Sequence, residues 1–238
     1  MKTYGLIGKN LLHSFSKIYF SRKFNKEKIT CAQYLDFEIQ DINEFKQLIN
    51  QYKFTGINVT NPYKELIIPL LNELSEEARI IGAVNTIRFH KNILIGYNTD
   101  HLGFRNSIKT LLKGRRKALI LGDGGAAKAI KYSLEQLGIS YKTVNRNTNF
   151  SYSDLTKEII EYYTIIINAT PEGSYPKIES FPNIPYKYLN KKHLLFDVIY
   201  NPKETKFLTY GKLQGACIKN GLEMLKIQAE ESWNIWNQ

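Results

Sequence analysis

The sequence predicts an α/β fold with two domains, each built on a sheet flanked by helices. Short apolar segments alternate along most of the chain with segments whose apolar residues recur at helical spacing. A glycine-rich turn follows one of the apolar segments near the middle of the chain, where a second strand–helix alternation begins. The 238 residues, 43% of them hydrophobic, suffice for one large core or two modest ones.

The first hundred residues indicate an α/β unit that ends in a hairpin. Asp41, with Glu44 three residues later, predicts a capping box that opens a helix. Pro62 predicts a further helix, which we expect to run to residue 74. The expected strands, which share short apolar or alternating patterns, are residues 3–7, 34–39, 54–59, 83–89 and 93–97. We expect a mostly parallel sheet in this domain.

A second alternation of strands and helices follows. A helix over residues 102–112 leads into an apolar strand, and the glycine-rich turn opens a helix that ends at Gly138. Polar segments separate the apolar strands, which predicts a parallel sheet; these strands are residues 117–121, 141–144, 164–168 and 194–199. The last helix, from about Leu222, is apolar on one face and must pack against another surface.

Composition excludes several functional classes. No run approaches the ~20 apolar residues of a membrane span, and no signal segment is visible, so we expect a cytoplasmic protein without a membrane partner. Cys31 and Cys217 have no partners at metal-ligand or disulfide spacing, so we expect ordinary thiols and no metal site. The net charge of +11 comes from scattered lysines rather than a cluster, so we expect no nucleic-acid partner. A positive field would suit anionic ligands.

The glycine-rich turn predicts a dinucleotide site. Strand, then Gly122-x-Gly124-x-x-Ala127, then helix lets a pyrophosphate approach bare backbone at a helix N-terminus. An acidic residue at the end of the next strand would bind the ribose of NAD, but the chain has Asn145 and Arg146 there. A guanidinium suits a 2′-phosphate, so we predict that the cofactor is NADP. An ordinary glycine-rich turn is the alternative.

Polar residues follow or begin several strands of the first domain, where packing alone would not require them. They are Ser14, Ser16, Thr60, Asn85 and Asp100. Ligands bind at the strand ends of α/β sheets, so these side chains predict a binding site. Lys64 lies four residues after Thr60 at the opening of the expected helix, and would point toward the same edge. A lysine in that place is more often simply solvated.

Several of these segments together resemble one known family. They are Asn58-Val59-Thr60 with Pro62 and Lys64, Gly82-Ala83-Val84-Asn85-Thr86, Asn98-Thr99-Asp100, and Gly221-Leu222-Glu223-Met224-Leu225 with Gln228. In this order, and over essentially the whole chain, they are similar to the motifs of the shikimate dehydrogenase family. The resemblance implies an oxidoreductase that interconverts 3-dehydroshikimate and shikimate with NADP(H), on the pathway to chorismate and the aromatic amino acids.

The resemblance also implies a role for each matching residue. Lys64 and Asp100 would be catalytic. The substrate would be bound by Ser14, Ser16, Thr60, Asn85, Tyr200 and Gln228. The cofactor would be bound by Gly122, Gly124, Gly125, Ala126, Asn145, Arg146, Thr170 and Gly221. Residues 1–100 with 221–238 would form the substrate domain, on which the last helix packs, and residues 101–220 a Rossmann-type domain.

Three alternatives stay open at this point. The nearest is a quinate/shikimate dehydrogenase paralogue that uses NAD, since it would share the fold and most of the site. A catalytically silent binding protein would also keep the fold, although it has no chemical reason to keep Lys64, Asp100, Asn85 and Gln228 together. A nucleic-acid-binding protein rests on the net charge alone. The resemblance implies a small-molecule substrate and a monomer or homodimer.

Overall fold

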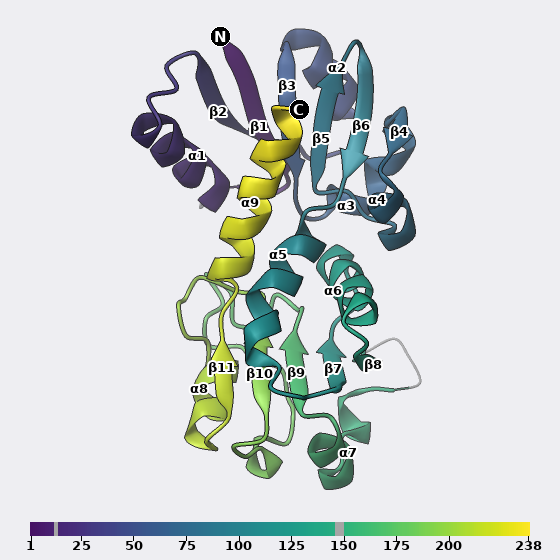
Figure 1. The fold of residues 1–238 in the computed structure, drawn as a ribbon, viewed down its shortest axis with the longest axis vertical. Coiled ribbons are helices and arrows are strands. Elements are labelled where there is room, and N and C mark those ends of the chain that lie inside the picture. Colours follow the sequence, from purple (N-terminus) through teal and green to yellow (C-terminus); the bar gives the residue numbers. More distant parts are fainter. Residues whose placement is uncertain (12–13, 146–149) are drawn as a thin grey trace. The chain divides into compact units, whose positions relative to one another are not determined.

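A computed structural model describes residues 1–11, 14–145 and 150–238. The chain divides into two compact units: residues 1–99 with 228–238 form the first unit, and residues 100–227 form the second. Each unit is an α/β layer structure built on its own sheet (Figure 1). The α/β fold class expected from the sequence is confirmed.

The first unit contains a mixed sheet of order β2-β1-β3-β5-β6-β4. Among the described strands only β5 runs against the others, so the sheet is mostly parallel, as predicted. Its strands are β1 (Lys2–Gly8), β2 (Ala32–Glu38), β3 (Phe54–Val59), β4 (Glu73–Leu74), β5 (Thr86–His90) and β6 (Ile93–Tyr97). Its helices are α1 (Phe15–Lys26), α2 (Glu44–Gln51), α3 (Tyr63–Leu66) and α4 (Glu76–Ile81), with a 3-10 turn η1 (Ile68–Leu70).

Apolar residues of the first sheet face both sides, because alternate residues of a strand point to opposite faces. On one face, Tyr4 and Leu6 of β1 pack against α1 and α9 (Leu222–Trp236), whose residues from Gln228 onward belong to this unit. On the other face, Ile57 and Val59 of β3 pack against α2, α3 and α4 (Figure 1). The last helix therefore packs on the first unit from Gln228 onward, as the family resemblance implied.

The second unit contains a parallel sheet of order β11-β10-β9-β7-β8. Its strands are β7 (Lys117–Leu121), β8 (Ser140–Val144), β9 (Ile165–Asn168), β10 (Leu194–Asp197) and β11 (Cys217–Lys219). Its helices are α5 (Asp100–Ile108), α6 (Gly125–Gln136), α7 (Lys157–Tyr162) and α8 (Lys206–Leu213), with 3-10 turns η2 (Lys109–Leu111), η3 (Tyr152–Asp154) and η4 (Tyr186–Tyr188). The parallel sheet and the glycine-rich turn after its first strand make this unit Rossmann-type.

The second sheet is buried on both faces. Ala118 and Ile120 of β7 pack with residues of α5 and α6, whereas Leu119 and Leu121 pack on the opposite face with residues of α7 and α8. Figure 1 shows α5 and α6 together on one side of the strands. Continuous apolar strands are the normal consequence of this two-sided burial.

The helix predicted from Pro62 to residue 74 is wrong in its second half. Helix α3 ends at Leu66, η1 follows, and Glu73 and Leu74 form β4 beside β6. Pro69 explains the break, because proline has no N–H to donate and disfavours helical geometry at the residue before it. The chain then joins the sheet edge, where Asn72 N donates to Leu94 O at 3.0 Å. Helix α4 was not predicted from the sequence.

The capping box predicted at Asp41 forms only in part. The Glu44 carboxylate accepts from Asp41 N at 2.8 Å, which is the expected return bond. The Asp41 carboxylate, however, accepts from Asn43 N at 2.7 Å, two residues on, so it closes a local turn. Helix α2 consequently begins at Glu44, with Asn43 as its N-cap.

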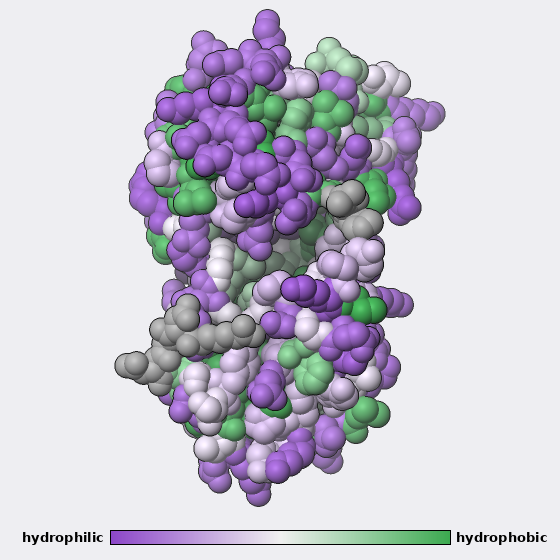
Figure 2. All heavy atoms as spheres, turned by 180° about the vertical axis from the view of Figure 1, so that it is seen from behind, coloured by the Kyte–Doolittle hydropathy of each residue, from purple (hydrophilic) through white to green (hydrophobic). Residues whose placement is uncertain are grey.

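Hydrophilic side chains predominate on the face of the first unit seen in Figure 2, with apolar side chains scattered among them. Cys31 and Cys217 are exposed free thiols. Among the described residues, no helix is long and apolar enough to span a membrane, and no three His, Cys, Asp or Glu residues come together in a way that could hold a metal ion.

Candidate active site

The polar residues that the sequence places at strand ends lie along one edge of the first sheet. Strands β1 and β3 run in parallel, with Ile7 opposite Val59, and β5 runs against β3, with Thr86 opposite Asn58. The carboxyl ends of β1 and β3 therefore meet the start of β5 and, because Thr86 also pairs with Tyr97, the end of β6. Thr60 directly follows β3 and Asn85 directly precedes β5 at this edge, whereas Ser14 and Ser16 follow β1 in the chain at the start of α1, and Asp100 follows β6.

The two serines open helix α1. Ser14 is its N-cap, and the hydroxyl accepts from Lys17 N at 3.3 Å. Ser16 is buried. Burial raises the pKa of the Asp36 carboxyl on β2, while the Ser14 hydroxyl and the Lys17 ammonium oppose that rise. Both serines thus lie at the N-terminus of α1, where the macrodipole favours an anion.

Thr60 and Lys64 follow β3. Thr60 N donates to Ile7 O at 2.9 Å, and Tyr63 N donates to Thr60 O at 2.9 Å, so the turn into α3 is fixed to the end of β1. Lys64 is half-buried on α3, and its carbonyl accepts from Val84 N at 2.7 Å. These backbone bonds hold the base of the Lys64 side chain near the chain segment that carries Asn85.

Asn85 and Gln228 lie together with Thr99 in a buried polar cluster. Asn85 Nδ2 donates to Thr99 Oγ1 at 3.0 Å and to Gln228 Oε1 at 3.3 Å. In return, Thr99 N donates to Asn85 Oδ1 at 2.7 Å. The amide of Asn85 therefore has both its donor and its acceptor side engaged, which fixes its orientation. Gln228, predicted from the sequence, is brought to Asn85 by the last helix.

Asp100 directly follows Thr99 and is the first residue of α5 in the second unit. Its side chain is 6% exposed. A carboxylate in the first turn of a helix interacts favourably with the helix dipole. Asp100 is therefore an acidic group that directly follows Thr99 in the chain and begins the second unit.

The glycine-rich turn lies at the topological switch point of the second sheet. From β7 the chain moves to β8 on one side, and β9 then pairs with β7 on the other. Ligands of open α/β sheets bind beyond the carboxyl ends of the strands at such a point. Gly122 has φ +101°, a conformation that favours glycine, and a Cβ there would lie 2.9 Å from the Thr170 methyl group.

Gly124 is different, because nothing in the fold requires a glycine there. Its φ of −86° and ψ of −174° are available to any residue, and a Cβ built on it meets no atom of the described residues within 4 Å. Gly124 caps α6, and Gly125 and Ala126 form its first turn, whose N–H groups have no intrahelical acceptor. The open space above a helix N-terminus fits a pyrophosphate group.

The remaining predicted cofactor residues lie at strand ends of the same sheet or beyond the described residues. Asn145 directly follows β8, and its N–H donates to Phe150 O at 3.1 Å. Arg146 lies outside the described residues. Thr170 follows β9, where its hydroxyl donates to Asn168 Oδ1 at 2.6 Å. Thr170 is thus positioned beside Gly122, although its hydroxyl already serves the local turn.

Tyr200 follows β10, and Gly221 follows β11, the neighbour of β10 in the sheet. A Cβ on Gly221 would collide with the Val198 carbonyl oxygen, so close chain approach alone explains this glycine. Gly221 N donates to Ile199 O at 3.0 Å, which ties the start of α9 to the end of β10. Tyr200 is half-buried just after β10.

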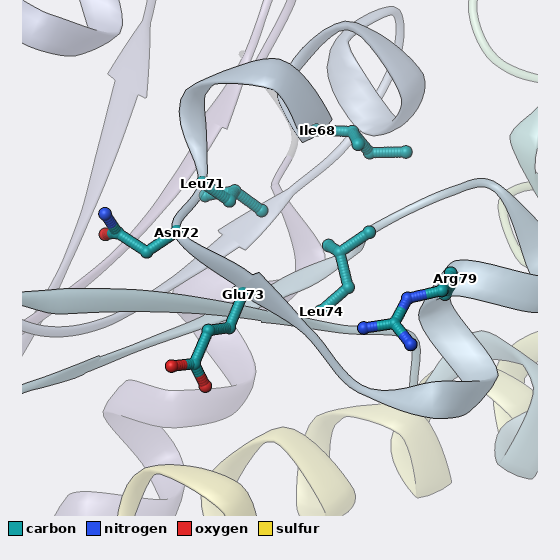
Figure 3. A pocket seen from close by; sticks show the side chains of 6 residues that line it. All are labelled: Ile68, Leu71, Asn72, Glu73, Leu74 and Arg79. Atoms are coloured by element: carbon teal, nitrogen blue, oxygen red, sulfur yellow. The ribbon is translucent and has the colours of Figure 1, made fainter.

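A separate surface hollow of about 430 Å³ lies on the first unit. Figure 3 shows the side chains that line it, which come from η1, the two residues after it, β4 and α4: Ile68, Leu71, Asn72, Glu73, Leu74 and Arg79. None of the described residues predicted to bind substrate or cofactor lines this hollow. Asn72 has a structural role, because its side chain accepts from Leu94 N at 2.8 Å.

Several polar residues that adjoin the Asn85 cluster were not predicted from the sequence. Asn58, within β3, and Ser232, on α9, are buried and hydrogen-bonded to each other at 3.0 Å. Asn58 carried a signal, because an amide within an apolar strand needs a buried partner. Ser232 carried none, because a single serine in an amphipathic helix is unremarkable in sequence.

Comparison with known proteins identifies relatives over the whole chain. Residues 6–87 match the family model described as the shikimate dehydrogenase substrate binding domain. A protein of Clostridium beijerinckii named shikimate dehydrogenase (NADP(+)) is 38% identical over 252 residues, which span 100% of this chain and 93% of the relative.

Solved structures give the same result. A crystal structure of a shikimate dehydrogenase in complex with NADP+ matches with a TM-score of 0.88 at 32% identity, covering 99% of this chain and 90% of the other. The shikimate 5-dehydrogenase of Listeria monocytogenes, solved in complex with shikimate and NAD, matches with a TM-score of 0.86 at 27% identity, covering 100% and 92%.

Proposed function

The chain belongs to the shikimate dehydrogenase family, and we propose that it catalyses the reversible NADP-dependent reduction of 3-dehydroshikimate to shikimate. The reaction consumes NADPH and one proton, and yields shikimate and NADP+. It belongs to the pathway that leads to chorismate and the aromatic amino acids. The observation that carries the proposal is the buried pairing of the Asn85 and Gln228 side chains at the sheet edge where Thr60 and Ser16 also lie.

The substrate residues suit a polyhydroxylated carboxylate. Ser14 and Ser16 at the N-terminus of α1 would bind the carboxylate, because hydroxyl donors and the helix dipole both favour an anion. Asn85, Gln228 and Thr60 would bind ring hydroxyls, since amides and hydroxyls both donate and accept. Tyr200 would border the substrate and the nicotinamide.

The cofactor residues suit NADP. The turn from Gly122 through Gly124 and Gly125 to Ala126 would hold the pyrophosphate, and Thr170 and Gly221 would border the nucleotide. Asn145 stands where an NAD-specific enzyme has an acid, and Arg146 would bind the 2′-phosphate. The nicotinamide supplies or accepts the hydride, and the protein supplies orientation and the proton path.

Lys64 and Asp100 would be the catalytic residues. Lys64 would exchange a proton with the oxygen of the reacting carbon, and Asp100 would assist Lys64 and bind a substrate hydroxyl. The half-buried position of Lys64, whose backbone is bonded to Val84, supports this role because it limits the freedom of the side chain.

A quinate/shikimate dehydrogenase that also uses NAD is the second candidate. The Listeria relative was solved with NAD, which keeps this cofactor in consideration within the family. Rates with shikimate and with quinate separate the two candidates, because quinate carries one more ring hydroxyl than shikimate and a site built for shikimate has no group for it.

We further propose that the protein works in the cytoplasm as a monomer or homodimer, without a nucleic-acid partner. The scattered distribution of its lysines supports the last point, because phosphate backbones require clustered charge. Mobility in a gel that does not change when DNA is added would agree with it, and a salt-sensitive shift would contradict it.

Four initial rates test the proposal. Purified protein is mixed with shikimate or quinate, each with NADP or NAD, and absorbance of the reduced nicotinamide is followed. Rapid reduction of NADP with shikimate, and slow reduction in the other mixtures, is the expected result. Equal or faster reduction of NAD would favour the second candidate. No reduction in any mixture, by folded protein that binds NADP, would contradict both.

A further inference from the structure

A buried network of polar side chains connects the last helix with the strands of the first unit. Helix α9 crosses the face of the sheet that carries Gly56 and Asn58 (Figure 1). Polar side chains fill the centre of this otherwise apolar contact and are all 6% exposed or less. They are Tyr34, Asn58, Asn85, Thr86, Thr99, Gln228 and Ser232.

Ser232 joins the helix to three parts of the sheet. Its hydroxyl donates to Gln228 O at 2.9 Å, one turn earlier in α9. It also accepts from Asn58 Nδ2 at 3.0 Å and lies 2.7 Å from Thr86 Oγ1. Thr99 Oγ1 lies 3.2 Å from the same hydroxyl. The side chain therefore fixes the rotation of α9 at the turn that carries Gln228.

Asn58 joins three strands. Its amide nitrogen donates to Asn85 O at 3.1 Å as well as to Ser232, and its Oδ1 accepts from the Tyr34 hydroxyl at 2.8 Å. Tyr34 lies on β2 and Asn58 on β3, and Asn85 directly precedes β5. The backbone of Asn85 is thus held from the side of Asn58, while its side chain is held by Thr99 and Gln228.

We propose that Ser232 and Asn58, with Tyr34 behind Asn58, are positioning residues that orient the Asn85 and Gln228 amides for the substrate hydroxyls. This inference rests on the proposed function, because it assigns those amides to the substrate. Asn85 and Gln228 would touch the substrate, whereas Ser232, Asn58 and Tyr34 act only through them.

The polar nature of the network supports positioning over packing. Apolar residues of the same volume often fill such a contact at least as stably. Buried polar groups lose their hydrogen bonds to water, and only well-aligned hydrogen bonds within the protein offset that loss. A fully satisfied network instead restricts side chains to one arrangement. The hydroxyl of Ser16, another proposed substrate residue, also interacts with the Tyr34 phenol, so the network extends toward the carboxylate end of the site.

Ser232→Ala tests the proposal against a matched control, Ser133→Ala. Both serines are fully buried on long helices, and both hydroxyls donate to the carbonyl four residues earlier at 2.9 Å. Only Ser232 reaches the Asn85 cluster. We expect Ser232→Ala to raise KM for shikimate about tenfold, the effect of losing one hydrogen bond between the amides and the substrate. The Kd for NADP should not change. Ser133→Ala should change neither value.

A second pair of variants avoids dependence on the folding of Ser232→Ala. Tyr34→Phe and Tyr186→Phe each remove one hydroxyl that donates at 2.8 Å, to Asn58 Oδ1 and to Pro182 O respectively. We expect Tyr34→Phe to raise KM for shikimate by a smaller factor than Ser232→Ala, because it acts one step further away. Tyr186→Phe should leave KM unchanged.

A cycle with Gln228→Ala separates positioning from a general loss of stability. If Ser232 acts through Gln228, adding Ser232→Ala to Gln228→Ala should change kcat/KM for shikimate far less than it does in the wild type. An equal fold-change in both backgrounds, or equal KM values for Tyr34→Phe and Tyr186→Phe, would overturn the inference. An inactive wild type would instead overturn the proposed function, so the two failures are distinguishable.

Discussion

Asn168 and Asp197 are register partners on β9 and β10, and the side-chain amide of Asn168 donates to Asp197 Oδ1 at 3.1 Å. Ile199 N donates to the same oxygen at 3.0 Å, and the Thr205 hydroxyl donates to Oδ2 at 2.5 Å. Burial raises the pKa of Asp197 to about 7, although these three donors oppose the rise. One carboxyl therefore joins the ends of two strands to Thr205, the N-cap of α8.

Asp197 should make the stability of the protein decrease as pH rises from about 4 to about 7. Unfolded Asp titrates near about 3.9, and burial raises the pKa of folded Asp197 to about 7. Between these values the folded state binds a proton that the unfolded state has lost, so the free energy of unfolding falls by at most about 1.4 kcal/mol per pH unit. Asp197→Asn removes this titration and keeps the acceptor for Asn168.

Urea midpoints of both proteins at a series of pH values check this prediction. The difference in stability between Asp197→Asn and the wild type should shift in favour of the variant as pH rises through that range, and level off above it. Two curves that stay parallel would mean that Asp197 does not titrate there in the folded protein.

Gly124→Ser should retain the fold and lose the cofactor. Gly124 is the N-cap of α6 with an extended conformation, and a Cβ on it meets none of the described residues, so serine fits and is a better cap by about a few tenths of a kcal/mol. The serine side chain would occupy the space proposed for the pyrophosphate. We expect an unchanged or higher melting temperature and an increase of at least about tenfold in Kd for NADP.

Gly122→Ala is the informative comparison for Gly124→Ser. Gly122 has φ +101°, and its Cβ would lie 2.9 Å from the Thr170 methyl group, so alanine there should lower the melting temperature. Calorimetry and NADP titration of both variants separate a conformational requirement from a ligand requirement. Normal NADP affinity in Gly124→Ser would remove this turn from the proposed cofactor site.

The sequence predicted those parts of the molecule that depend on local patterns. The glycine-rich turn after β7 and the polar strand ends around Thr60 and Asn85 are local signals, because the turn conformation and the end of an apolar run are encoded nearby. In the structure, Thr60 and Asn85 lie at one edge of the first sheet. Their roles as ligands remain predictions.

The parts that sequence reasoning missed depend on pairing between distant segments. Asn58 and Ser232 are 174 residues apart, and their bond exists only because α9 crosses β3 in one register. The same applies to Glu73 and Leu74, which looked like the end of a helix but join β6 as an edge strand. Propensity is a weak guide where the tertiary partner decides the outcome.

Gly56→Ala should destabilise the first unit through the last helix. A Cβ on Gly56 would collide with the indole of Trp236, whose Nε1 donates to Ile87 O at 3.0 Å. Overpacking of this kind costs about 1 to 3 kcal/mol. Urea denaturation should therefore give a lower midpoint for Gly56→Ala than for the wild type.

The double variant Gly56→Ala with Trp236→Leu identifies the cause. Trp236→Leu alone should destabilise by creating space, and the added methyl group should then fill part of that space. The two losses should consequently be less than additive, as expected for residues in contact. Strict additivity would show that Gly56 is required for another reason.

Lys64→Ala should reduce turnover strongly and leave substrate affinity almost intact. If Lys64 exchanges the proton, its loss removes general acid–base assistance, worth about 10²- to 10⁴-fold in kcat. KM for shikimate should change little, because the substrate would be held by the serines and amides at the sheet edge. Lys53→Ala, at an exposed position in the same unit, is the control and should behave as the wild type.

Lys64→Arg distinguishes proton transfer from simple charge. Arginine keeps a positive charge at this position but does not release its proton in proteins, because its pKa exceeds about 12. If Lys64 transfers the proton, Lys64→Arg should be nearly as slow as Lys64→Ala. If Lys64 only stabilises negative charge on the substrate oxygen, arginine should restore much of the rate. Steady-state kinetics of the two variants, with NADP saturating, therefore decide whether Lys64 is an acid–base group or an electrostatic one.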